Sequence, residues 1–181
     1  MNTFNYSEML AESHELQQHD FIGLMISKVC EHYGLNIAKW RHGSSADDKL
    51  GGDVVVSLKN GKEVLIDLKI AKGERGQRVP LEIERGRNQK ALPWSIDGSK
   101  GHLVLWLNPD IKWAYVASRK RLAGALLAQS DATRSMLAKA KRCTPETQTD
   151  RDKFISPVLL IDRFRFGLWL KSEAIGGKLY G

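Results

Sequence analysis

The chain has 181 residues and a net charge of +7, with 42% hydrophobic and 27% charged residues. This composition is typical of a soluble globular protein that can build one core without disulfide bonds, so we expect a single domain over residues 1–181. No apolar run approaches the roughly 20 residues of a membrane span, and the N-terminus lacks the basic start and apolar stretch of a secretion signal. Cys30 and Cys143 show no CxxC or Cys/His spacing, which predicts free thiols and a reducing, cytoplasmic setting.

The first predicted element is a helix from about Ser7 to Tyr33, with a possible break near His19-Asp20. Its apolar stripe recurs at steps of three and four residues through Ile22, Met25, Ile26, Val29 and Tyr33. Gly34 follows as a natural C-terminal stop, and a short strand is expected at Leu35–Trp40. Residues 41–52 are polar and contain glycine, which predicts a loop.

A β-hairpin is the clearest signal in the chain. Two β-rich runs, Asp53–Leu58 and Lys62–Ile70, flank Asn60-Gly61, and this dipeptide is the strongest short-range hairpin signal. Residues 71–78 then predict a charged loop, and the stretch from Leu81 to Ala91 fits a strand or a helical turn.

The second half alternates between strands and helices. We expect strands at His102–Leu107 and Trp113–Ala117, helices from Ser118 to about Gln129 and at Thr133–Arg142, and late strands at Pro157–Ile161 and Phe164–Leu170. The order of elements predicts an α/β sandwich built on a mixed sheet flanked by helices.

Strand alternation places Asp67 and Lys69 side by side. Val64, Ile66, Leu68 and Ile70 share one face of their strand, and Leu65, Asp67 and Lys69 share the other. Burying a carboxylate and an ammonium is costly without a partner, which indicates a purpose for the pair. The alternative is an ordinary hairpin with Asp67 and Lys69 exposed on an edge.

The length of the turn decides whether Asp53 joins this pair. A two-residue loop at Asn60-Gly61 would pair Asp53 with Leu68 and direct its side chain to the opposite face. A three-residue loop over residues 59–61, with glycine in the left-handed position, would place Asp53 directly opposite Asp67. A bulge at Gly51-Gly52 would also redirect Asp53. A site with both carboxylates therefore requires the longer loop or the bulge.

The pattern Gly52-Asp53, a hairpin and then Asp67-Leu68-Lys69 resembles the PD-(D/E)xK nuclease superfamily, which has the restriction endonuclease-like fold. The resemblance covers this motif and the order of elements from about Ser7 to Gln129, and Gly52 stands where the family name has proline. It implies that Asp53, Asp67 and the Leu68 carbonyl bind Mg²⁺ or Mn²⁺, and that Lys69 orients the attacking water.

Sites of this family often add a glutamate from the first helix. Glu15 extends the predicted apolar stripe by two turns, whereas Glu31 points the other way, so Glu15 is the expected catalytic partner. Glu82 and Glu84 follow the motif strand and are further candidates. For each glutamate the alternative is a solvated carboxylate.

Basic residues follow the motif strand directly. They are Lys72, Arg75, Arg78, Arg85, Arg87 and Lys90, and glycines at 73, 76 and 86 lie among them. Beside a metal site such a segment suits phosphate contact, which makes these residues the candidate nucleic-acid-binding set; a solvated loop is the alternative. A second basic run, Arg119 to Arg121, begins a predicted helix and is a further contact or a solubilising face.

The leading hypothesis is a Mg²⁺-dependent deoxyribonuclease, an endonuclease in which metal-held water attacks phosphorus. Because a DNA duplex has two strands and the chain has one such site, we expect a homodimer. The expected interface includes Phe154, Phe164, Phe166 and Trp169. Two alternatives remain: the same enzyme acting on RNA, and a protein that binds nucleic acid without cleaving it.

Overall fold

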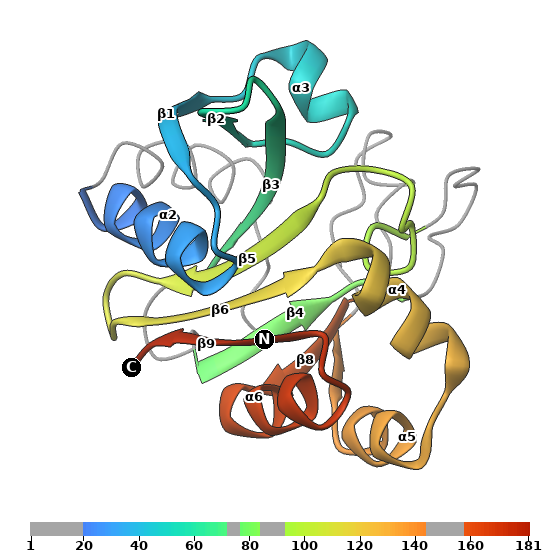
Figure 1. The fold of residues 1–181 in the computed structure, drawn as a ribbon. Helices are drawn as coiled ribbons and strands as arrows, with labels where there is room; N and C mark the ends of the chain where they lie inside the picture. The colour runs from blue at the N-terminus through green and yellow to red at the C-terminus, as the bar shows by residue number, and fades with distance from the viewer. Residues whose placement is uncertain (1–19, 72–76, 84–92, 144–157) are drawn as a thin grey trace, which may run out of the picture.

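The computed structural model describes residues 20–71, 77–83, 93–143 and 158–181. They are organised by a six-stranded mixed sheet with the order β1-β2-β3-β5-β6-β9 (Figure 1). Its strands are β1 Ile37–His42, β2 Val54–Leu58, β3 Glu63–Ile70, β5 Leu103–Asn108, β6 Trp113–Ser118 and β9 Gly176–Tyr180. β3 and β5 run parallel, and the other neighbours are antiparallel. The expected mixed α/β architecture is confirmed.

A second sheet and five helices complete the described part of the fold. The second sheet has the order β4-β8-β7, with β4 at Arg78–Leu81, β8 at Val158–Asp162 and β7 at Lys141–Cys143. The helices are α2 Asp20–His32, α3 Ser45–Lys49, α4 Arg119–Ala128, α5 Asp131–Ala138 and α6 Arg163–Ser172. None of the described helices is long and apolar enough to cross a membrane.

The large sheet separates two hydrophobic cores. On one face α2 buries Ile22, Met25, Ile26 and Val29 against apolar residues of β2, β3 and β5. On the other face α4, α5, α6 and the small sheet cover Val104, Trp106 and Tyr115. The predicted stripe of the first helix is thus confirmed from Ile22 to Val29, and Gly34 ends the helix with a φ of 62°.

The β2–β3 turn has the longer of the two expected loops. The Leu58 N–H donates to the Lys62 carbonyl at 2.8 Å, so the loop is Lys59-Asn60-Gly61, and Gly61 has a φ of 81°. The ladder pairs Val54 with Ile66 without a register shift, which puts Asp53 opposite Asp67. The turn alone therefore sets the register that brings the two aspartates together, and a bulge is not needed.

Gly61→Ala is expected to lower the free energy of unfolding by about 1 kcal/mol, because a Cβ at positive φ meets the backbone. Apart from Gly61 itself and its two chain neighbours, no atom lies within 4 Å of the position that this Cβ would take, so the cost is conformational. Gly124→Ala is the matched control: it lies within α4, also with open space, and is expected to stabilise by up to about 1 kcal/mol. Urea unfolding measures the free energy of unfolding of both variants. Equal changes in this free energy for Gly61→Ala and Gly124→Ala would contradict the turn assignment.

Several elements differ from the sequence predictions. Residues 41–52 contain helix α3, whose capping box joins the Ser44 and Asp47 side chains to each other's backbone N–H. Phe164–Leu170 is not a strand but most of α6, whose N-terminal N–H groups are capped by Asp162. The helix predicted at Thr133–Arg142 ends at Ala138, and β7 follows. Strand β9 was not predicted, and residues 7–19 of the predicted first helix lie outside the described part.

Candidate active site

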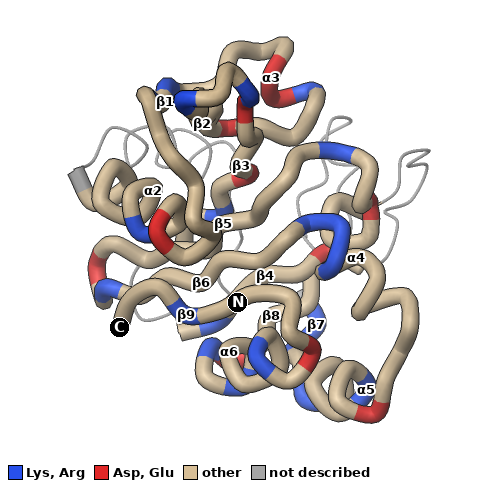
Figure 2. The backbone as a smooth tube through the Cα atoms, in the orientation of Figure 1, with Lys and Arg blue, Asp and Glu red and all other residues tan. Residues whose placement is uncertain are grey.

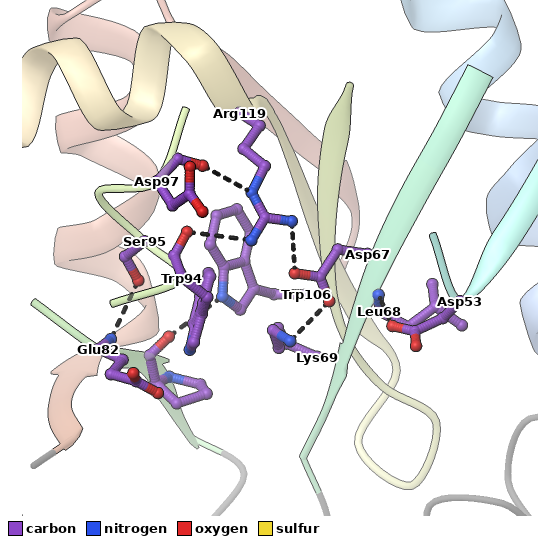
Figure 3. A network of polar contacts seen from close by, with 11 residues as sticks. Asp53, Asp67, Leu68, Lys69, Glu82, Trp94, Ser95, Asp97, Trp106 and Arg119 are labelled. Carbon is purple, nitrogen blue, oxygen red and sulfur yellow. Dashed lines mark hydrogen bonds and ion pairs between the residues drawn. The ribbon is translucent and has the colours of Figure 1, made fainter. Parts of the chain in front are cut away.

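Asp53 and Asp67 face each other at the open end of the β2–β3 hairpin. Asp53 immediately precedes β2, and its Oδ2 accepts a 2.7 Å hydrogen bond from the Leu68 backbone N–H (Figure 3). Besides burial, the negative charge of Asp67 is close enough to Asp53 to raise the pKa of its carboxyl. The pair is therefore held by the hairpin itself, and no other element is needed to bring these two carboxylates together.

The backbone around Leu68 explains the position of Asp53. Even-numbered residues of β3 direct their N–H and C=O groups toward β2, as the Leu58–Lys62 and Val54–Ile66 pairs show. Because the ladder ends at Val54, the Leu68 N–H bonds to the Asp53 carboxylate instead of a β2 carbonyl. Within a strand the C=O of a residue points the same way as its N–H, so the Leu68 carbonyl also points toward Asp53.

Asp67 is buried and forms ion pairs with two cations. It is 6% exposed, its Oδ1 lies 2.6 Å from Lys69 Nζ, and its Oδ2 lies 2.9 Å from Arg119 Nη1. The predicted juxtaposition of Asp67 and Lys69 is confirmed. The alternative of an exposed edge pair is wrong, because Asp67 belongs to a central strand of the sheet.

Burial raises the pKa of Asp53 to about 6, and the negative charge of Asp67 adds to the rise. The charge of Lys69 and the hydrogen bond from Leu68 act in the opposite direction and only partly offset it. Because the Asp53 carboxyl resists ionisation in this position, binding of a cation beside it would favour its charged form. A shifted carboxyl beside a charge partner is also a typical signature of a functional site.

Arg119 was predicted only as part of a basic surface run, whereas the structure buries it to 2% exposure against Asp67. Its Nε donates to the Asp97 carbonyl at 3.2 Å and its Nη2 to the Trp94 carbonyl at 3.1 Å. A Cβ at Gly51, whose φ is 81°, would lie 2.9 Å from Arg119 Nη1, so glycine leaves room for the guanidinium. Odd-numbered residues of β6 lie on the same face of the sheet as Asp67, as the pairing of Asp67 with Val104 and of Val104 with Ala117 shows. The same alternation, continued one residue past the end of β6, would have placed Arg119 on this face.

Lys69 is held between Asp67 and an aromatic side chain. Its Nζ lies 4.6 Å from the ring centroid of Trp94, a cation–π geometry, and its side chain is 26% exposed. Trp94 in turn packs against Trp106, with ring centroids 6.2 Å apart. Lys69 therefore extends from the buried carboxylate toward solvent in an ordered position.

The oxygen atoms of Asp53, Asp67 and Leu68 could supply some, but not all, of the ligands of a divalent cation. Two carboxylates and a carbonyl on one strand end are the oxygen ligands that Mg²⁺ and Mn²⁺ take. Among the described residues, however, no group of three or more His, Cys, Asp or Glu side chains lies close enough together to hold a metal. Glu82 lies on the far side of Trp94 from Asp53 in Figure 3, and Glu31 is exposed on α2. Glu15 and Glu84 lie outside the described residues.

The predicted nucleic-acid contacts can be placed for one residue. Arg78 is exposed at the start of β4, whereas Lys72, Arg75, Arg85, Arg87 and Lys90 lie outside the described residues. Lys and Arg also occur on β1, α3, α4 and the elements around α6, so positive charge is spread over several elements (Figure 2). Lys100 and Lys120 are exposed on the two segments that meet near Arg119.

No protein-family model matches this chain, and comparison with curated proteins and with solved structures finds no match either.

Proposed function

We propose that the protein is a metal-dependent deoxyribonuclease of the PD-(D/E)xK type with a restriction endonuclease-like fold, and that it cleaves within DNA. The observation that carries the proposal is the convergence of Asp53, Asp67 and Lys69 at one strand end. A two-residue β2–β3 loop would have placed Asp53 on the opposite face of the sheet from Asp67 and Lys69. With the three-residue loop, Asp53 lies opposite Asp67, and Lys69 contacts Asp67. Metal-assisted hydrolysis of a phosphodiester uses ligands for the ion together with positive charge beside the phosphate.

Asp53, Asp67 and the Leu68 carbonyl would hold Mg²⁺ or Mn²⁺ in this proposal, with Glu15 as the further ligand from the N-terminal segment. When bound, the ion supplies a water of lowered pKa and positive charge beside the phosphate. Each oxygen of Asp67 keeps a second lone pair beyond its contact with Lys69 or Arg119, so it can still act as a ligand.

Lys69 has the two roles that its position allows. Its ammonium has three donors, of which Asp67 takes one, and its side chain is 26% exposed, so further donors are available to a phosphate or a water. It orients the attacking water and stabilises the negative charge that develops on the phosphate oxygens. The water oxygen forms a bond to phosphorus, one P–O bond breaks, and a proton reaches the leaving oxygen.

The positive charge of the chain supports a polyanionic substrate. The net charge is +7, and the described residues include exposed Arg78, Lys100 and Lys120. Binding through phosphates releases counterions, so we expect affinity for DNA to fall steeply between about 50 and 200 mM salt. A titration of fluorescent duplex at three salt concentrations with Ca²⁺, which occupies oxygen sites, measures this slope.

Cleavage of both strands of a duplex would require two copies of the site, and we therefore retain the homodimer as part of the proposal. Phe166 and Trp169 cannot form the interface as expected, because both are buried in the core at 0% and 3% exposure. Phe164 and Leu168 are 58% and 72% exposed and lie one turn apart on α6. Sedimentation of the protein with and without Phe164→Ser tests this interface.

The experiment that tests the function is a cleavage panel with purified protein in Mg²⁺, in Mn²⁺ and in EDTA. Linear duplex, branched duplex, single-stranded DNA and RNA are incubated with wild type and with Lys69→Met. Cleavage of DNA that needs the metal and is lost in Lys69→Met is the expected result. Preference for RNA would transfer the proposal to a ribonuclease, and binding without cleavage of any substrate would contradict it.

A further inference from the structure

We propose that Arg119 is a positioning residue, which holds Asp67 by a direct ion pair and holds Lys69 in place through Trp94. The inference rests on the proposed function only for its effect on cleavage; the contacts themselves can be tested without it. Arg119 makes no contact with solvent that would let it touch a nucleic acid, since it is 2% exposed. Any effect of Arg119 on the reaction must therefore pass through its neighbours.

The first link is the ion pair with Asp67. Arg119 Nη1 lies 2.9 Å from Asp67 Oδ2, while Lys69 Nζ lies 2.6 Å from the other oxygen, Oδ1. A carboxylate held at one oxygen by a rigid guanidinium presents its other oxygen in a fixed direction. Arg119 thus sets the rotation of the carboxylate that Lys69 contacts.

The second link passes through the segment 93–98, which is neither helix nor strand. Arg119 binds this segment at two backbone carbonyls, those of Trp94 and Asp97, at 3.1 and 3.2 Å. The indole of Trp94 lies 4.6 Å from Lys69 Nζ (Figure 3). The guanidinium therefore ties Asp67 and the Trp94 backbone to the start of α4, and the Asp67 carboxylate and the Trp94 ring both contact Lys69.

Only a planar guanidinium, with donors on three nitrogen atoms, can donate at once to the Asp67 carboxylate and to the Trp94 and Asp97 carbonyls. An ammonium carries its donors on one atom and cannot reach Asp67, Trp94 and Asp97 together. Gly51 lies against the guanidinium, because a Cβ at this position would come within 2.9 Å of Arg119 Nη1. The space is thus shaped for an arginine side chain.

Arg119→Gln is expected to lower kcat about 10- to 100-fold, the usual effect of removing a group that orients a ligand of the site. The KM for DNA and its salt dependence are expected to stay unchanged, because Arg119 is buried. Arg165→Gln is the matched control: it also removes one guanidinium, from α6, which packs against β4, β8 and β9. This control is expected to keep kcat within about twofold.

A spectroscopic readout separates positioning from a general structural role. In protein labelled with ¹³C-lysine, the NMR signals of the Lys69 ε-methylene protons can be assigned by their absence in Lys69→Arg. The Trp94 ring is expected to change the chemical shifts of these protons. Trp94→Phe is expected to reduce this change in chemical shift. Arg119→Gln is expected to reduce it as well, because segment 93–98 loses its hydrogen bonds to the guanidinium. Arg165→Gln is expected to leave it unchanged. A loss of stability alone would not move the Lys69 signal of the folded protein.

Each outcome decides one of the two claims. If folded Arg119→Gln keeps the wild-type Lys69 signal and kcat, the positioning role is wrong. If Arg119→Gln does not fold, Trp94→Phe decides, and an unmoved Lys69 signal there overturns the inference. If wild type cleaves no nucleic acid while the Lys69 signals shift as expected, the proposed function fails and the role of Arg119 in holding Lys69 stands.

Discussion

Asp53→Asn is expected to stabilise the metal-free protein at pH 8 by about 3 kcal/mol and to abolish cleavage. The pKa of Asp53 is raised from its ordinary 3.8 to about 6, and one pKa unit corresponds to about 1.4 kcal/mol. A carboxyl whose pKa is raised on folding favours the folded state below pH 4, and this contribution is lost as the pH rises through 6. An amide side chain avoids the loss because it is never charged.

The substitution also preserves the local hydrogen bonds. The amide oxygen that Asp53→Asn introduces can accept from the Leu68 N–H as the carboxylate does at 2.7 Å. Urea unfolding at pH 4.5 and pH 8 in EDTA measures the effect. The stability gained by Asp53→Asn is expected to be much smaller at pH 4.5 than at pH 8. A variant that is less stable than wild type at pH 8 would show that Asp53 is charged without strain, contrary to the account.

Asp67→Asn is expected to have the opposite effect on stability, lowering it by about 3–5 kcal/mol, because it leaves a buried arginine without its anion. Arg119 is 2% exposed and Asp67 is its carboxylate partner at 2.9 Å. Cleavage is expected to fall at least about a thousandfold, since charge stabilisation by a bound metal is worth several kcal/mol.

The matched control for this variant is Asp131→Asn. Asp131 also pairs with an arginine, Arg134, but its side chain is 95% exposed, so its loss is expected to cost less than about 1 kcal/mol. Thermal unfolding at pH 7.5 compares the two. Similar losses in both variants would mean that the Asp67–Arg119 pair is not the buried contact described above.

Under the proposed function, the contrast between these two aspartates would be a trade between stability and activity. Asp67 is neutralised by Lys69 and Arg119, whereas among the described residues Asp53 is compensated by a backbone N–H and by the charge of Lys69 alone. Of the two aspartates, Asp53 is therefore the one whose charged form would gain more from binding a divalent ion. Stability lost in this way is common where function requires a strained site.

The positions of Asp53, Asp67 and Lys69 could be predicted from the sequence because they depend on strand alternation and on one turn, both of which involve residues close together in the chain. The alternation of side chains along β3 puts Asp67 and Lys69 together, and the Asn60-Gly61 signal restricts the turn to two registers. Local rules could not choose between those registers. The positive φ of Gly61 and the pairing of Leu58 with Lys62 decide the choice.

The parts that were not predicted depend on tertiary contacts. Arg119 lies far from Asp67 in the sequence, and a basic run at a helix start gives no sign that its first member is buried. Large apolar residues recur at every second position from Phe164 to Leu170, as in a strand, but the helix buries Phe166, Trp169 and Leu170 on one side. Over seven residues the periods of 2 and 3.6 are hard to separate, and the Asp162 cap is the local signal that favours helix.

The most direct test of the central claim is a crystal structure of the protein soaked in Mn²⁺, with anomalous scattering measured to locate the ion. The account predicts one anomalous peak bonded to oxygens of both Asp53 and Asp67, with Lys69 still in contact with Asp67. Crystals at saturating Mn²⁺ and pH 8 that show no peak between these carboxylates and keep Asp53 bonded to the Leu68 N–H as in the metal-free protein would contradict it.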